Sequence, residues 1–245
     1  MKSENKKENS FLEFFKTVVW AIAIALIFRS FLFEPFSIPS GSMIPTLKVG
    51  DYLFVSKYSY GYSRYSFPFG IIPFSGRLLK SDPQRGDVIV FRKPGDENVD
   101  YIKRLVGLPG DEIFVQEGIL HINGAPVTRR LEADMPGERG PLNRPSVIYT
   151  ETFPEGHEHL IQEYSDNDRM DNTPPRLVPE GHYFFMGDNR DNSRDSRAEI
   201  GFVPAENLVG RAEFLFFSHN GRAGLFEIWK WPSAIRFSRI GMSID

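Results

Sequence analysis

The sequence predicts a mostly β protein that follows a single N-terminal transmembrane helix. Only the first part of the 245-residue chain contains an apolar stretch of membrane length. The chain also carries 21 glycines and 18 prolines, scattered among short runs of apolar and β-branched residues. Turn residues that bound such runs are typical of strands, and helical periodicity is scarce beyond the apolar stretch.

The apolar stretch covers residues 11–33, but its unbroken apolar run, Val18 to Phe28, is short. A helix needs ~20 residues to cross a bilayer, so the span must extend beyond this run. Lys16 and Arg29 then reach toward the two head-group regions. The alternative is a cleaved signal peptide, but bulky side chains occupy residues 31–36, where small residues should precede a cleavage site. We therefore expect a permanent anchor.

Positive charge is concentrated on the N-terminal side of this stretch. Lys2, Lys6 and Lys7 precede it and Lys16 lies near its start, whereas only Arg29 lies near its far end. Because flanking Lys and Arg residues set the orientation of a membrane helix, we expect residues 1–10 to form a cytoplasmic tail. The chain beyond the anchor is then expected on the outer side of the membrane.

Composition excludes several classes of function. The chain has no cysteine, which excludes a disulfide framework, a thiol nucleophile and cysteine-ligated zinc. The net charge is −3 at pH 7 and no long basic run occurs, so we expect no nucleic-acid partner.

Eight runs beyond the anchor have the character of strands. They are Tyr52–Lys57, Asp87–Arg92, Asp100–Val106, Glu112–Gln116, Ile119–Ile122, Val147–Thr152, His182–Met186 and Gly210–Phe217. Residues 127–176, called the excursion below, are polar and rich in proline and charge, and we predict no chemistry there. The aromatic residues of 58–73 and of 225–240 suit either membrane contact or ordinary packing.

Ser42 is the first candidate for chemistry. It lies shortly after the anchor, between Pro39 and Pro45, which limit the backbone on both sides. Gly41 permits a close approach that a side chain would block. Such a rigid turn can present a hydroxyl and direct a backbone N–H at a developing oxyanion, and Ser40 offers a second donor. A linker leaving the membrane is an equally good interpretation of this stretch alone.

A nucleophilic serine needs a base, and none of the five histidines lies in a serine-hydrolase signature. His157 and His159 fall in an acidic stretch that we interpret as a solvated loop. Lys103 differs, because in a strand it shares a face with Tyr101 and Leu105. Burial against such neighbours lowers the pKa of lysine and allows it to accept a proton.

Considered alone, this strand favours another interpretation of Lys103. This is a surface lysine that pairs with Asp100 or Glu112.

Residues 187–197 form a dense polar loop after a predicted strand, with three Asp, three Arg and two Asn. A calcium loop is excluded, because Arg190 occupies a ligand position and Ser193 occupies that of the required glycine. We expect this loop to be an ion-paired brace for a neighbouring site.

Together these elements resemble the bacterial type I signal peptidases, which are membrane-bound serine–lysine proteases. The resemblance rests on the anchor and on five boxes in the family's order: Pro39–Leu47, Gly50–Asp51, Arg85–Phe91, Tyr101–Asp111 and Gly187–Pro204. It implies an antiparallel β catalytic core from residues 34–111 and 180–245. A smaller inserted β domain is expected from residues 112–179.

The resemblance also implies roles for single residues. Ser42 is the expected nucleophile, Lys103 its general base, Ser40 and the Ser42 N–H the oxyanion hole, and Ser193 the residue that orients the lysine. Asp188, Asp195 and Arg197 are expected to support the site. The residues expected to line shallow substrate pockets are Phe36, Ile38, Met43, Leu47, Leu53, Val90, Tyr101 and Ile102.

The implied activity is removal of N-terminal signal peptides from exported preproteins, at the outer face of the cytoplasmic (inner) membrane. No cofactor and no metal are expected, and the expected partners are preproteins and membrane lipid. Two alternatives remain. One is a specialised serine–lysine peptidase of the pilin or conjugation type. The other is a catalytically silent, anchored module that binds export machinery, against which the intact serine and lysine weigh.

Overall fold

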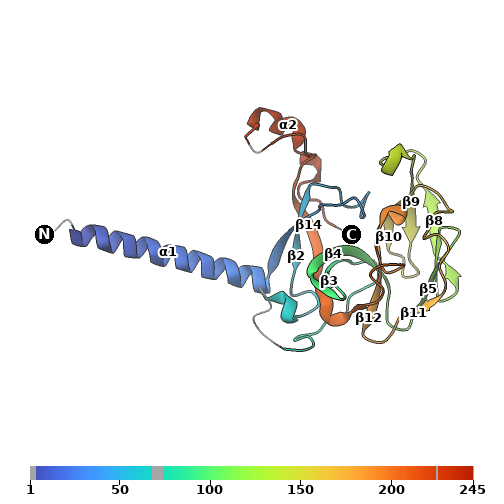
Figure 1. Cartoon of the computed structure of the whole chain (residues 1–245), viewed down its shortest axis with the longest axis horizontal. Helices are drawn as coiled ribbons and strands as arrows, with labels where there is room; N and C mark the ends of the chain where they lie inside the picture. Colours follow the sequence, from blue (N-terminus) through green and yellow to red (C-terminus); the bar gives the residue numbers. More distant parts are fainter. Residues whose placement is uncertain (1–3, 68–73, 225, 245) are drawn as a thin grey trace.

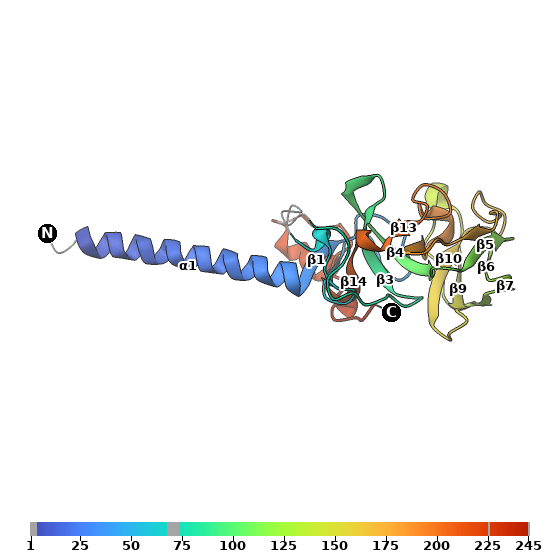
Figure 2. The same cartoon turned by 90° about the horizontal axis from the view of Figure 1, so that it is seen from below.

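A long helix, α1 (Glu4–Phe31), extends from one side of a β-rich body (Figure 1). The view from below shows the same separation of helix and body (Figure 2). This computed structural model describes residues 4–67, 74–224 and 226–244. The two aromatic segments of the sequence analysis are therefore described only in part, since residues 68–73 and 225 lie outside the described residues.

Within α1, the 21 residues Phe11–Phe31 are long and apolar enough to cross a membrane. The predicted span ended at residue 33, which is two residues too far, because Phe33 already belongs to a strand. Pro35 accounts for this early end, since proline disfavours helical geometry in the residue before it and cannot donate a helical hydrogen bond. The helix begins at Glu4, so residues 4–10 of the expected tail are helical.

The largest sheet has seven strands in the order β1-β2-β14-β3-β4-β12-β13, and its neighbouring strands are antiparallel. The strands are β1 (Phe33–Ser37), β2 (Asp51–Ser56), β3 (Val88–Lys93), β4 (Asp96–Gly107), β12 (His182–Met186), β13 (Val203–Pro204) and β14 (Leu208–Ser218). The last long strand, β14, therefore lies in the middle of the sheet, between two strands from the first half of the chain.

Two smaller antiparallel sheets lie at the end of the body away from α1 (Figure 1). One has the order β10-β9-β8, with β8 (Thr128–Leu131), β9 (Val147–Thr152) and β10 (Glu158–Glu163). The other has the order β11-β5-β6-β7, with β5 (Glu112–Gln116), β6 (Ile119–Ile122), β7 (Ala125–Pro126) and β11 (Arg176–Leu177). A short helix, α2 (Trp231–Ala234), follows β14.

The prediction of a mostly β protein behind one apolar helix is confirmed. Four of the eight expected strands have the predicted bounds, namely β5, β6, β9 and β12, and the other four shift by one to four residues at an end. The interpretation of His159 as part of a solvated loop is wrong. This residue lies on β10 and is only 6% exposed, because its side chain faces the buried Glu151 of β9.

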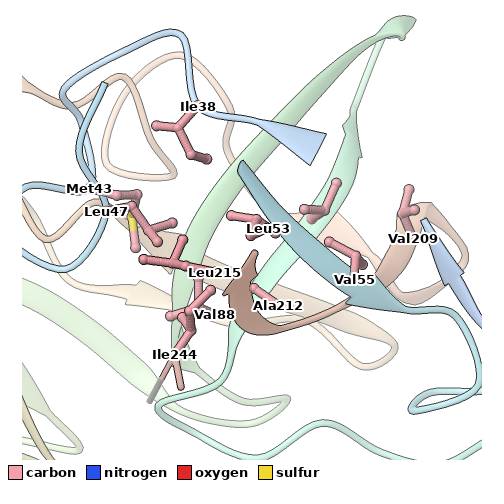
Figure 3. Close-up of a cluster of buried hydrophobic side chains, with 11 residues drawn as sticks. Ile38, Met43, Leu47, Leu53, Val55, Val88, Val209, Ala212, Leu215 and Ile244 are labelled. Atoms are coloured by element: carbon pink, nitrogen blue, oxygen red, sulfur yellow. The ribbon is translucent and has the colours of Figure 1, made fainter. Parts of the chain in front are cut away.

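One of the hydrophobic clusters fixes the position of the Ser42 loop (residues 39–47). Met43 and Leu47 are fully buried among apolar side chains of β2, β3 and β14, as Figure 3 shows. Burial of side chains of this size contributes roughly 1.5–3 kcal/mol each. The Ser42 loop is therefore packed against the main sheet and is not an extended linker that leaves the membrane.

Candidate active site

Ser42 and Lys103 meet at the surface of the main sheet. The Lys103 Nζ lies 2.7 Å from the Ser42 Oγ and 2.8 Å from the backbone oxygen of Ile102. Lys103 is 3% exposed and Ser42 is 8% exposed. The serine hydroxyl and the lysine amine are thus within hydrogen-bond distance in a setting from which most water is excluded.

The strand pairing explains why this pair lies at an open edge. Lys103 of β4 is opposite Ile89 of β3, which supports one side of the strand. On its other side, β12 pairs with β4 only over residues 104–107. Within the described strands, the edge of β4 at residues 99–103 is therefore unpaired, and the Ser42 loop lies beside it.

Burial lowers the pKa of Lys103 to about 8, and the more distant charges of Asp195 and Asp188 oppose this effect. Among the described residues, no carboxylate forms an ion pair with the amine. The strand considered alone favoured a surface lysine paired with Asp100 or Glu112, and the structure contradicts that interpretation. Asp100 instead lies 3.2 Å from Arg92.

The predicted strand face is present. The Lys103 Nζ lies 5.4 Å from the centre of the Tyr101 ring, and Leu105 is fully buried further along β4. The ring covers the amine but carries no net negative charge. It therefore stabilises the protonated amine less than a carboxylate would, and raises the pKa of the lysine less.

Two potential donors lie beside the Ser42 hydroxyl. The Ser40 Oγ is 3.5 Å from the Ser42 Oγ. The Ser42 backbone N–H makes no hydrogen bond to any residue that the structure describes. Its own carbonyl is occupied, because the Asn189 N–H donates to it at 3.1 Å.

The loop of residues 187–197, called the brace loop below, holds the Ser42 loop by its backbone. Asn189 contacts two consecutive residues, since its side-chain amide also donates to the Gly41 carbonyl at 2.9 Å. Gly187 permits the close approach. A Cβ added at Gly187 would lie 2.5 Å from the Ser42 carbonyl oxygen and 2.2 Å from the Ser193 Oγ. Neither contact is tolerable for a real side chain.

Two buried ion pairs stabilise the brace loop. Asp195 binds Arg197 at 2.9 Å and accepts a hydrogen bond from the Gly187 N–H. Asp188 binds Arg104 at 2.8 Å and accepts the Thr46 hydroxyl at 2.6 Å. Although burial raises the pKa of each carboxyl group, the adjacent guanidinium lowers it below its ordinary value, so both stay ionised.

Ser193 lies in the brace loop with its Oγ buried and without a hydrogen bond to any described residue. Its hydroxyl is close enough to Asp195 to help lower the pKa of that carboxyl group. The structure brings Ser193 to the wall of the same cleft as Lys103, but it shows no hydrogen bond between the two side chains.

The eight expected pocket residues fall into two groups. Tyr101 and Ile102 line an open cleft of about 1110 Å³ that also contains Ser42 and Lys103. Most of the others belong to the hydrophobic cluster behind the cleft (Figure 3), and Phe36 packs against that cluster. The fully buried members of this group are Ile38, Met43, Leu47, Leu53 and Val90.

Sequence reasoning missed several residues of the site. Asn189 was not singled out from its polar loop. Thr46 and Arg104, which bind Asp188, fell within the matched boxes but were given no role. Residues 168–170 of the excursion also line the cleft, although no chemistry was predicted there. Among the described residues, no group of three or more His, Cys, Asp or Glu side chains is placed to hold a metal ion.

Comparisons with known proteins give a consistent assignment. The family model described as "Signal peptidase, peptidase S26" matches residues 11–217. Signal peptidase I of Rickettsia typhi is 41% identical over 258 residues, covering 98% of this chain and 97% of that protein. Signal peptidase I of Rickettsia canadensis is 44% identical over 211 residues, covering 83% and 78%.

A solved structure also shows a partial match. The crystal structure of a signal peptidase I from Enterococcus faecalis V583 is 28% identical and covers 54% of this chain and 97% of that chain, with a TM-score of 0.32.

Proposed function

Because this chain belongs to the signal peptidase family, peptidase S26, we propose that it cleaves signal peptides from exported preproteins, with Ser42 as nucleophile and Lys103 as base. The observation that carries the proposal is the 2.7 Å approach of a buried lysine amine to a serine hydroxyl. A buried lysine whose pKa is about 8 is substantially neutral at mildly alkaline pH, and only the neutral amine can accept the hydroxyl proton.

The proposed reaction has two halves. Lys103 takes the Ser42 proton as the Oγ attacks the scissile carbonyl, and the protonated amine then donates this proton to the leaving amine of the mature protein. The Oγ–acyl ester that remains is attacked by water, from which neutral Lys103 removes a proton. The ester bond breaks, the proton returns to Ser42, and the signal peptide leaves as a free acid. No cofactor or metal takes part.

Ser40 and the Ser42 backbone N–H are proposed to bind the oxyanion in both halves. Two observations support this role. The Ser42 N–H makes no hydrogen bond to a described residue, and the Ser40 hydroxyl lies beside the proposed nucleophile. Donors aimed in advance at a developing negative charge stabilise the transition state more than the ground state. Ser193 is proposed to orient Lys103 in the bound complex. Asp188, Asp195 and Arg197 are proposed to hold the loop that positions both.

The substrate is proposed to bind as an extended strand along the unpaired edge of β4. Main-chain hydrogen bonds to a free strand edge give affinity, and pockets for alternate side chains give specificity. Tyr101 and Ile102 line the cleft at this edge, and the other six expected pocket residues pack tightly behind this apolar surface. Such a surface leaves room for small side chains at positions −1 and −3 before the cleaved bond, as signal-peptide cleavage sites have.

The proposed location is the cytoplasmic (inner) membrane, in single-pass form. Helix α1 supplies the anchor, and the lysines that precede it support a cytoplasmic N-terminus with the β body on the outer side. Residues 34–111 and 180–245 are proposed as the catalytic core, and residues 112–179 as an inserted second domain. Protease added to spheroplasts should digest the chain beyond residue 34 and spare the N-terminal end.

The decisive experiment is to incubate the purified full-length protein with an exported precursor and to sequence the new N-terminus. Cleavage after an A-x-A-like site, absent in the Ser42→Ala protein, is the expected result. Cleavage of pilin-type precursors only would indicate the specialised peptidase. No cleavage of any precursor by folded, membrane-reconstituted protein would support the silent binding module.

A further inference from the structure

The cleft continues past Ser42 to a rim formed by Asp168, Arg169 and Met170. The rim belongs to the polar excursion and follows β10 in the chain, and the proposed reaction assigns it no role.

The brace loop holds the rim in place. The Asp191 carboxylate accepts hydrogen bonds from the backbone N–H groups of Tyr164 at 2.6 Å and Ser165 at 3.2 Å. The Gln162 N–H donates to the Asp188 carbonyl at 2.8 Å. The chain that leads to the rim is therefore fastened to the same loop that fixes the position of Ser42.

The carboxylates of the cleft have partners. Asp168 binds Arg144 at 2.7 Å, Asp100 binds Arg92 at 3.2 Å, and Glu199 binds Lys93 at 3.1 Å. Asp191 forms no ion pair with a described residue, but its Oδ2 accepts hydrogen bonds from the two N–H groups described above.

The two arginines that line the cleft, Arg169 and Arg194, have less well compensated guanidinium groups. Arg169 is exposed, and its guanidinium makes no hydrogen bond or ion pair with any residue that the structure describes. Arg194 is 80% exposed and has only a distant contact of 3.6 Å with Glu199. These two guanidinium groups outnumber the one cleft carboxylate without an ion pair, Asp191, so the balance of uncompensated charge in the cleft is positive.

The direction of the substrate follows from the position of the anchor. The apolar part of a signal sequence lies in the membrane, so it approaches from the side of α1 and β1. In both views β10 lies on the side of the body away from α1 (Figures 1 and 2). The residues that follow the cleaved bond therefore run toward the rim, advancing ~3.3 Å per residue when extended.

We propose that Arg169, assisted by Arg194, forms a subsite that binds acidic side chains among the first few residues of the mature protein. This subsite rests on the proposed function, and it adds a second recognition element to the small residues before the cleaved bond. Met170 also lines the cleft and offers an apolar side chain that the stem of a Glu side chain can contact.

The test uses three precursor peptides with alanine at −3 and −1 that differ only at +2, where they carry Glu, Gln or Lys. Wild-type protein should cleave them with kcat/KM in the order Glu, Gln, Lys, by about two- to fivefold per step, as expected for exposed charge pairs. Arg169→Glu should reverse the order, and Arg169→Ala should remove most of it. High salt should weaken the wild-type preference, because exposed charges are screened.

Arg222→Glu is the matched control, because Arg222 is also exposed but does not line the cleft. It makes the same change in net charge and should keep the wild-type order. If Arg169→Glu and Arg222→Glu both keep that order, or if wild-type protein cleaves all three peptides equally, the subsite is overturned although the peptidase activity stands.

Binding of the same peptides to Ser42→Ala protein separates the two proposals. A preference for Glu that depends on Arg169, without cleavage by wild-type protein, would support the subsite and refute the peptidase. Equal dissociation constants for the three peptides would refute the subsite whatever the outcome for cleavage.

Discussion

Lys57 and Lys103 are buried to a similar degree, at 1% and 3% exposure, yet they lie in opposite electrostatic environments. The Lys57 Nζ binds the Glu34 carboxylate at 2.7 Å, whereas the Lys103 Nζ contacts a hydroxyl, a carbonyl and the Tyr101 ring, and no carboxylate among the described residues. Burial lowers the pKa of both lysines, but at Lys57 the adjacent Glu34 opposes this. Burial alone therefore does not make a base.

The carboxylates near Lys103 explain the difference. Asp195 and Asp188 both raise the pKa of Lys103, but each carboxylate is itself bound to an arginine. Their attraction for the amine is thereby weakened, and desolvation dominates. The ion pairs of the brace loop thus act on the lysine as well as on the position of the Ser42 loop.

The largest expected effect is a difference in kcat between substitutions of Lys103 and of Lys57. Ser42→Ala and Lys103→Arg should each lower kcat by about 10⁴-fold or more, because a nucleophile and its base act as a unit and arginine keeps its proton. Lys57→Arg keeps a charge beside Glu34 and should retain activity. Folding is checked by circular dichroism, and kcat is measured on a precursor peptide. An active Lys103→Arg protein would place the base elsewhere.

The next effect concerns the apolar surface at the edge of β4. Replacing alanine by leucine at −1 of the substrate should lower kcat/KM by roughly 10–100-fold. Overfilling a packed pocket costs about 1–3 kcal/mol, and displacement of the carbonyl from its donors adds to the loss. The matched pair of peptides is compared on wild-type protein. Equal rates would show that the pocket lies elsewhere, even if Ser42 and Lys103 carry the reaction.

The pH dependence follows from the lowered pKa of Lys103. Below about 8 the amine is protonated and cannot accept the serine proton, so kcat/KM should fall about tenfold for each pH unit. At pH values above the pKa of Lys103, kcat/KM should reach a plateau. A rising limb that continued to the ordinary lysine pKa of ~10.4 would contradict the buried base.

The smallest effect tests the electrostatic comparison directly. Arg197→Met leaves Asp195 without its cation, so the pKa of Lys103 should rise, and the rising limb of the pH profile should shift to higher pH by about one unit. Glu34→Gln removes the carboxylate of Lys57 instead and should leave this limb unchanged. The pH profile is measured for both variants after thermal melts show folded protein. An unchanged limb in folded Arg197→Met protein would refute the role assigned to the arginine.

Much of the site could be predicted because its residues occur in short, distinctive boxes. Ser42, Lys103 and Asp195 each lie in such a box, and β12 has the predicted bounds. The first strand, β1, was not predicted. Its first residue, Phe33, was assigned to the anchor, because it continues an apolar run whose periodicity does not separate helix from strand.

The remaining errors come from buried polar contacts. Strand β10 was missed because its side chains are polar, and their burial depends on partners far along the chain. Arg190 binds Glu151 in two hydrogen bonds, beside His159, whose pKa is lowered by burial to about 4. The rim was missed for the same reason. Arg169 carries no local signal, since its place at the cleft depends on how the excursion docks against the brace loop.

The position of β14 has a consequence for the order in which the protein is synthesised and folds. Ser42 follows β1 and precedes β2, and Lys103 lies on β4 beside β3; among the described strands, backbone pairing joins these two parts of the sheet through β14. That strand, Leu208–Ser218, is synthesised after all four of the others. Pairing over such sequence distances is slow compared with local folding. We therefore expect Ser42 and Lys103 to come together only after β14 has been synthesised and has paired with both β2 and β3.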